Sequence, residues 1–497
     1  MKKLLIFFMI FSVLMNQGYA LSAPAGFSGG VNNEYTYEEM VFVTGKPLKF
    51  TGTVSISERE KQDSKTVSYS FDLTSPDLSE KNQLRRTVTY VTQYNNRNDK
   101  GQAIAQTEVQ SYNERIIIGR DQYNLEDYQF SKSDVIDNRP ASDFYSGNFN
   151  GRKYYTINKN EGNVVIEITG GDVGYENFWG STETQIMVFS ISSQRYVVDE
   201  QNNEKKSVSW KGTVNVQVSD SMTKSLSYYD NEATLSSFNG GYVRTTEREM
   251  VSKYEYNLPK MNGNIPDGSK RNNDSVSLSA QMVPRVERLI VPKFRDVEGH
   301  WAQDYIEKLY SLDVFDTSSS FFVPEAPMTR EEFIKGIIRA CNIRSSMDTQ
   351  KKTVTRRKQA PEVSPFKDVS PQDPDYSYIK EGLDKGIVTG VTKDSFKPGA
   401  PLTRAQAVTI LVRALGFGNK APNPGYQTSF SDDDKIPYWA KDSIYVAREI
   451  NLIEGDSQNR VNPNKVMTRA EASAMLVRFL EFLQKDLQKD YRENIML

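Results

Sequence analysis

Three arginines in the C-terminal third of the chain are placed where an anion could be bound. Each follows a threonine, and each threonine is followed three places later by Glu or Gln, which is the pattern of a capping box at a helix start. The pairs are Thr329 and Arg330, Thr403 and Arg404, and Thr468 and Arg469. Each arginine then takes the first helical position, where the helix dipole disfavours a cation by about 0.3 to 1 kcal/mol. The repeated mismatch indicates a compensating anion.

The anion has two candidate sources, and the residues do not choose between them. A guanidinium beside free helix N–H groups suits an external carboxylate or phosphate. The alternative is internal pairing with the aspartates of a second recurring motif, Phe-x-Asp, which are Asp296, Asp368 and Asp432. Such pairs would connect the repeats to one another.

Both motifs recur in order, so the C-terminal third is an internal repeat of short helical units. We place the repeats at 292–343, 364–418 and 428–482, with a basic linker at 344–363 and a charged helical tail at 483–497. In the first repeat Cys341 lies on an apolar helix face, where a thiol acts as a small hydrophobic group.

The preceding region has a different period. Val67, Tyr69, Phe71 and Leu73 occupy alternate places, the mark of half-buried strands. We expect a mainly-β antiparallel region over 31–260, either a sandwich or one strongly curled sheet. Residues 261–291, rich in Gly, Asn, Asp and Ser at their start, are expected to be a linker, and residues 1–20 are expected to be a secretory signal peptide.

Composition excludes several classes of function. The 497 residues hold 62 Lys plus Arg against 64 Asp plus Glu, which gives no basic field for nucleic acid. One His, His300, and one Cys rule out a Cys/His zinc cluster and an internal disulfide, and we expect no metal and no cofactor. We take His300 as a structural or surface residue. No second apolar run resembles a membrane span after the leader.

The β region offers little positive sign of catalysis. It lacks His and Cys, so triad chemistry is unavailable within it, although two carboxylates could still cleave a glycoside. Its aromatic residues Tyr154, Tyr155, Tyr175 and Trp179 could form a binding platform, but sheet packing is the more common role of such residues. We expect no catalytic residue there.

The repeats resemble the S-layer homology (SLH) domain in three tandem copies. The resemblance rests on Phe-x-Asp, then Trp-Ala, a glycine-containing loop, Phe-x-Pro, and Thr-Arg-Ala-Glu. In the first copy these are Phe294, Trp301, Ala302, Phe322 and Pro324, followed by Thr-Arg-Glu-Glu. The family implies a pseudo-threefold all-α unit whose inter-repeat grooves bind secondary cell-wall polysaccharide, typically through a pyruvylated sugar. The ketal carboxylate would then be the anion beside the arginines.

The copies depart unevenly from the family pattern. Gly390 and Gly455 supply the loop glycine that lets the backbone approach a sugar, whereas the first copy has Asp316-Thr317 there. Trp301 and Trp439 either fill the core, which we favour, or stack on sugar; the second copy has Pro374 instead. The three grooves are therefore expected to differ in competence.

These observations give a leading hypothesis and two alternatives. The first is a secreted, non-catalytic envelope protein held by its SLH repeats on the wall of a Gram-positive-type bacterium, displaying a structural or adhesive β domain. The second is an anchored polysaccharide hydrolase with two unseen carboxylates. The third is a repeat unit that only assembles the protein, with peptidoglycan or other surface proteins as further candidate partners.

Overall fold

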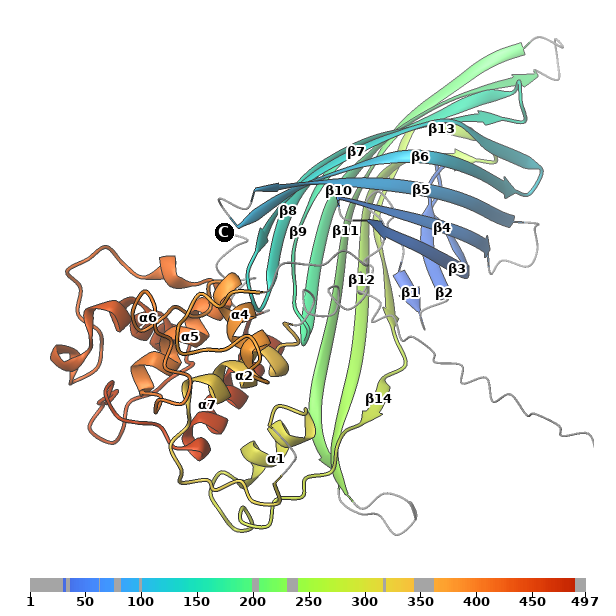
Figure 1. Cartoon of the computed structure of the whole chain (residues 1–497). Coiled ribbons are helices and arrows are strands. Elements are labelled where there is room, and N and C mark those ends of the chain that lie inside the picture. The colour runs from blue at the N-terminus through green and yellow to red at the C-terminus, as the bar shows by residue number, and fades with distance from the viewer. Residues whose placement is uncertain are drawn as a thin grey trace, which may run out of the picture.

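The computed structural model describes residues 30–32, 36–61, 63–75, 82–97, 101–198, 205–229, 240–315, 319–343 and 362–487. It confirms the predicted fold class, because an antiparallel β region precedes a helical C-terminal unit (Figure 1). The expected signal peptide, most of the basic linker, Asp316-Thr317 and residues 488–497 lie outside the described part. None of the helices in the described ranges is long and apolar enough to cross a membrane.

Fourteen strands make up the β region, and several are unusually long. The strands are β1 (Gly30–Asn32), β2 (Thr36–Val41), β3 (Leu48–Lys61), β4 (Ser64–Thr74), β5 (Asn82–Arg97), β6 (Gln102–Ile118), β7 (Asp121–Asn138), β8 (Asp143–Ile157), β9 (Gly162–Glu176), β10 (Gly180–Val198), β11 (Lys205–Tyr229), β12 (Gly241–Asn262), β13 (Ile265–Gln281) and β14 (Arg285–Arg288).

The strands form one curled sheet, which settles the choice that the sequence left open. β1 to β13 pair in chain order, each antiparallel to the next, and β14 pairs with β12. Alternation fixes the inner face: Val214, Val216 and Val218 of β11 are buried, while the residues between them are exposed. The two ends of the sheet approach one another, since the ring of Phe42, after β2, lies 5.8 Å from that of Tyr254 on β12; no pairing between the first and last strands joins them in the part of the chain that the structure describes.

The linker prediction for 261–291 is wrong, because these residues form β13 and β14. The prediction that this segment buries few side chains is confirmed. β13 is exposed along most of its length, and only its residues Leu278 and Ala280 are buried. Its backbone nevertheless pairs with β12 from Glu249 to Asn262. A polar strand at the edge of a sheet can be held by backbone hydrogen bonds to the N–H and C=O groups of its neighbour. Amino-acid composition does not reveal such bonds.

Two helices belong to each C-terminal repeat. They are α1 (Gln303–Ser311) and α2 (Arg330–Ala340), α4 (Tyr376–Asp384) and α5 (Arg404–Leu415), and α6 (Tyr438–Glu449) and α7 (Arg469–Glu481). Short helical turns η1 (Gly418–Lys420), η2 (Asp433–Lys435) and η3 (Phe482–Asp486) complete the unit. The second helices carry the core: Phe333, Leu411 and Phe479 are fully buried.

The three repeats meet in a closed ring of backbone hydrogen bonds. The Leu402 N–H donates to the Met328 carbonyl (2.8 Å), Met467 N–H to Leu402 (2.9 Å), and Met328 N–H to Met467 (3.0 Å). Each of these residues precedes the threonine that begins a second helix. The ring therefore holds the starts of α2, α5 and α7 around a common pseudo-threefold axis.

Candidate functional site

The three threonines cap their helices as the spacing predicts. Thr329, Thr403 and Thr468 each accept the N–H of the residue three places on, and the Glu or Gln at that position accepts the threonine N–H at 3.1 Å. The capping boxes set the direction of α2, α5 and α7. All three arginines consequently lie at one end of the helical unit, around the ring.

The N–H groups behind the arginines are not free, contrary to the external-anion argument. Arg330 N–H donates to Ala400 O (3.1 Å), Arg404 N–H to Lys465 O (2.9 Å), and Arg469 N–H to Ala326 O (2.8 Å). The next N–H of each helix also donates to the following repeat. These partners lie far away in sequence, so sequence could not show them. Only the guanidinium groups remain for a ligand.

The aspartates do not neutralise the arginines either. Asp296 accepts the N–H groups of Phe322 (2.8 Å) and Val323 (2.7 Å), and Asp432 makes the matching bonds to Val461 and Asn462 (2.8 Å each). Asp368 binds the Phe396-Lys397-Pro398 segment of the second repeat in the same way. Burial acts to raise the pKa of Asp368, but these donors lower it to about 2. The aspartates hold the loops against which the arginines pack.

Each arginine reaches into the following repeat, but the three contacts differ. Arg330 donates from Nε to Phe396 O (3.1 Å) and from Nη2 to Thr389 O (3.2 Å), is only 6% exposed, and has its pKa lowered by burial. Arg404 is half-buried and donates from Nη2 to Glu454 O (3.2 Å); burial, its largest influence, also lowers its pKa. No carboxylate among the described residues pairs with either of these two.

Arg469 has an internal carboxylate partner that the sequence did not suggest. Its Nη1 lies 3.2 Å from Oε1 of Glu332, the same glutamate that closes the first capping box. Its guanidinium carbon lies 4.5 Å from the centre of the Phe322 ring. Within the described part of the chain, its buried Nε finds no acceptor. The guanidinium of Arg469 is itself partly accessible, with 24% of the side chain exposed.

The core interpretation of the two tryptophans is wrong. Trp301 is 59% exposed and Trp439 52% exposed, and each stands at the start of a first helix. Trp301 belongs to the repeat that Arg469 contacts: its neighbour His300 binds Glu325 (2.9 Å), and Ala326, the residue after Glu325, accepts the Arg469 N–H. Likewise, Trp439 belongs to the repeat that Arg404 contacts, and Pro374 to the repeat that Arg330 contacts.

The loop glycines serve the loops themselves. A Cβ on Gly390 would collide with Thr392 O, and one on Gly455 would lie 2.8 Å from the backbone of Asn459. Their close contacts are with their own turns, so the structure gives them a structural reason for being glycine. Beside Gly390, a shallow depression is lined by Phe366, Leu383 and Thr389 among others.

A family model supports the repeat geometry. The S-layer homology domain model matches residues 293–334, 365–408 and 429–473. The C-terminal region consists of three SLH domains. The chain is 30% identical over 191 residues to an exoglucanase XynX of Acetivibrio thermocellus, which covers 38% of this chain and 16% of that protein.

Further relatives of the SLH region include surface proteins. The chain is 31% identical over 119 residues to a surface-layer 125 kDa protein of Lysinibacillus sphaericus, covering 23% of this chain and 10% of that one. It is 34% identical over 90 residues to a cellulosome-anchoring protein of Acetivibrio thermocellus, covering 18% and 20%. The chain thus spans less than a fifth of the exoglucanase, and 9% and 18% of an amylopullulanase and an endoglucanase.

The aromatic residues proposed as a platform in the β region are packed. Tyr155, Tyr175 and Trp179 are buried, and Tyr154 is half-buried. Sheet packing is confirmed for Tyr155, whereas Tyr175 and Trp179 pack in the core of the helical unit. Cys341 is buried as expected for a small hydrophobic group, and burial raises the pKa of its thiol.

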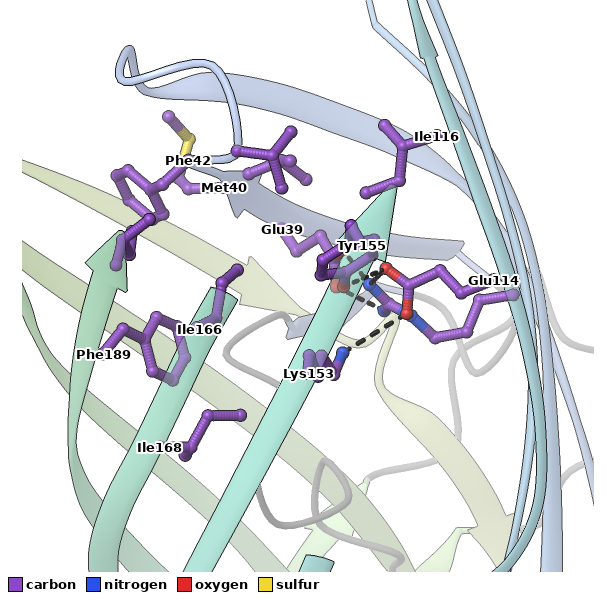
Figure 2. Close-up of a pocket in the computed structure, with 14 residues that line it drawn as sticks. Glu39, Met40, Phe42, Glu114, Ile116, Lys153, Tyr155, Ile166, Ile168 and Phe189 are labelled. Atoms are coloured by element: carbon purple, nitrogen blue, oxygen red, sulfur yellow. Dashed lines mark hydrogen bonds and ion pairs between the residues drawn. The ribbon is translucent and has the colours of Figure 1, made fainter. Parts of the chain in front are cut away.

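The sheet encloses an ionic cluster that sequence reasoning missed (Figure 2). Arg86 donates to both oxygens of Glu39 (2.9 Å each) and of Glu114 (2.7 and 3.2 Å). Glu114 also accepts Lys153 Nζ (3.3 Å) and the Tyr155 hydroxyl (2.9 Å). The only signal in the sequence was a charged residue at a position that the alternation assigns to the buried face of a strand. Arg86 lies between Leu84 and Val88, which are both buried.

Proposed function

We propose that this protein is held non-covalently at the bacterial cell surface by its SLH domains, which bind a secondary cell-wall polysaccharide. The observation that carries the proposal is that Trp301 and Trp439 are exposed in the two repeats that are contacted by the partly accessible arginines Arg469 and Arg404. An aromatic face suits the apolar side of a sugar ring, and a guanidinium suits a carboxylate such as a pyruvyl ketal.

The two grooves with a tryptophan carry the binding in this proposal. In the remaining groove Arg330 is buried and donates hydrogen bonds to two backbone carbonyls. The repeat that it contacts has Pro374 in place of tryptophan. Two modest sites on one rigid unit raise retention on a repeating polymer through effective concentration. Attachment therefore needs no tight single site.

The β region would be displayed away from the polymer. The arginines lie at the N-terminal ends of α2, α5 and α7, whereas the sheet meets the opposite ends of these helices (Figure 1). A wall polymer at the arginine end leaves the sheet exposed, on a Gram-positive-type wall, in a structural or adhesive role.

Replacing Arg469 with alanine is expected to weaken wall binding about tenfold or more, because a charge-assisted hydrogen bond contributes roughly 1.5 to 3 kcal/mol. The measurement is co-sedimentation of the full chain with wall sacculi, before and after removal of the polysaccharide or of its pyruvyl groups. Arg152→Ala removes the same charge from an exposed position on β8 and should bind normally. Equal binding by Arg469→Ala and Arg152→Ala, or full binding to stripped walls, would refute the groove mechanism.

The ionic cluster around Arg86 does not favour the hydrolase alternative. The space beside the ionic cluster measures about 50 Å³, whereas ligand pockets typically measure about 300 to 1,000 Å³. The carboxylates that line it are engaged by Arg86, Lys153 and Tyr155. Display is therefore the function that we propose for the β region.

A further inference from the structure

The β region and the SLH unit share one hydrophobic core. Ala141, Tyr175 and Trp179, at the ends of β-hairpins, are buried in the same cluster as the SLH residues Phe333, Leu411 and Phe479. Tyr175 lies at the end of β9 and Trp179 in the turn to β10, while Ala141 lies in the turn between β7 and β8. The tips of two hairpins therefore enter the helical unit.

Trp179 is the largest side chain in this contact, and its position is fixed from both sides. It is 0% exposed, and its indole Nε1 donates to Ala340 O at 2.9 Å. Within the turn, the Asn177 side-chain oxygen accepts the N–H groups of Trp179 (2.8 Å) and Gly180 (2.9 Å). This Asx-type turn directs the indole into the helices rather than into the sheet.

Two of the three SLH domains receive a donor from the sheet at the end of the second helix. Ala340 O ends α2 and accepts from Trp179; Ala414 O, in the last turn of α5, accepts the Ala141 N–H at 2.9 Å. The last carbonyls of a helix lack partners within it, so these two donors act as C-terminal caps. A third contact reaches the continuation of α7, where Leu483 O within η3 accepts from Asn177 Nδ2 at 3.4 Å.

We propose that the β region is a structural component of the anchor rather than a tethered passenger. The β7–β8 and β9–β10 tips, defined by residues 138–143 and 176–180, cap α2 and α5 and contact η3, which continues α7. Anchor and displayed sheet then fold and move as one body. This inference goes beyond wall attachment and does not depend on any ligand.

Two further contacts favour a rigid connection. The Phe144 ring lies 6.3 Å from that of Phe417, just beyond the end of α5. On the far side, the hydroxyl of Tyr242 on β12 donates to Asp304 O in α1 at 3.1 Å. Figure 1 shows β11 and β12 extending alongside the helical unit as far as α1. Together, the Trp179 bond to α2 and the Tyr242 bond to α1 connect the sheet to the first repeat at two separate places.

The test uses the full chain and the number of its unfolding transitions. The wild type should unfold in one calorimetric transition. Trp179→Ala should split it in two and lower the SLH transition by roughly 10 °C. Trp210→Ala removes an equal, partly buried ring that packs only within the sheet, and should keep a single transition. Two independent transitions in the wild type, or one unsplit transition in Trp179→Ala, would overturn the proposal.

A milder variant keeps the test decisive if Trp179→Ala does not fold. Trp179→Phe retains an aromatic ring but loses the donor to Ala340 O. Amide hydrogen exchange should then accelerate several-fold in the last turn of α2. It should remain as in the wild type in the last turn of α5, whose donor from Ala141 is unchanged, and around the ring of Met328, Leu402 and Met467. Exchange that is unchanged in the last turn of α2, or raised equally at both of its ends, would contradict capping by the sheet.

Discussion

Replacing Arg86 with methionine is expected to destabilise the protein by about 3 to 5 kcal/mol, the cost of removing one partner from a buried ion cluster. Arg86 is buried and holds two buried carboxylates, Glu39 and Glu114, through four hydrogen bonds. Methionine has a similar volume but no charge, so the two carboxylates would be left with a single cation, the ammonium group of Lys153. Burial lowers the pKa of this ammonium group, which weakens its hold on a proton. Chemical denaturation at neutral pH measures the loss.

The pH dependence identifies the cause of the loss. Burial acts to raise the pKa of Glu114, but Arg86 and Lys153 lower it to about 2 in the wild type. Its contribution to stability is therefore present above the ordinary pKa and is lost as pH falls through about 2. Without Arg86 the folded-state pKa of Glu114 should rise. The variant should then recover stability relative to the wild type as the pH is lowered toward about 4.

Neighbouring residues give the matched control. Arg85 is adjacent in sequence, points to the other face of the sheet and pairs at 3.6 Å with Asp72 in an exposed position. Arg85→Met should change stability by less than about 0.5 kcal/mol, as exposed ion pairs do. Adding Glu39→Gln and Glu114→Gln to Arg86→Met should restore part of the loss. If Arg86→Met is as mild as Arg85→Met, the cluster does not connect β2, β5, β6 and β8 as described.

Local signals were read correctly from the sequence, and features made between distant segments were not. The capping boxes at Thr329, Thr403 and Thr468 depend on residues three apart, and the inward alternation of the strands depends on residues two apart. By contrast, the acceptor of the Arg469 N–H lies in the first repeat, and the acceptor of the Trp179 indole is 161 positions away. No local sequence pattern reveals such distant partners. The helix N–H groups beside the arginines were therefore predicted to be free.

Two errors share a physical origin. Trp301 and Trp439 were assigned to the core by their residue type, yet both are exposed at helix starts. Residues 261–291 were assigned to a linker by theirs, yet β13 is a paired strand. Hydrophobicity predicts burial on average, but an exposed binding face or a backbone-only ladder is independent of it. In both places composition alone does not decide the structure.

A second polar cluster lies on the inner face nearer the SLH unit and sets a pH dependence of opposite sign. Lys132 Nζ lies 2.6 Å from Asp172 and 3.0 Å from Asp134. The other oxygen of each aspartate is buried without a donor among the described residues. Gly147 lies between them in register and leaves the space that the Asp134 carboxylate fills. One lysine thus serves two buried carboxylates.

This arrangement should make the protein less stable as the solution becomes neutral. Burial, together with the charge of Asp134, raises the pKa of Asp172 to about 6, against the opposing effect of Lys132. Burial likewise raises the pKa of Glu176 to about 7. A raised carboxyl pKa gives stability that is present below about pH 4 and lost as pH rises through the folded-state value.

Asp172→Asn is therefore expected to stabilise the protein by about 2 to 3 kcal/mol at pH of about 8, and to leave stability near the wild-type value at about pH 4. The amide removes one buried charge, can donate to the Asp134 carboxylate, and leaves Lys132 paired with Asp134. Urea unfolding across this pH range measures the effect, with the exposed Asp63→Asn as control. Destabilisation of Asp172→Asn at the higher pH would mean that Asp172 is ionised and fully compensated by Lys132, and that the two aspartates do not compete for one cation.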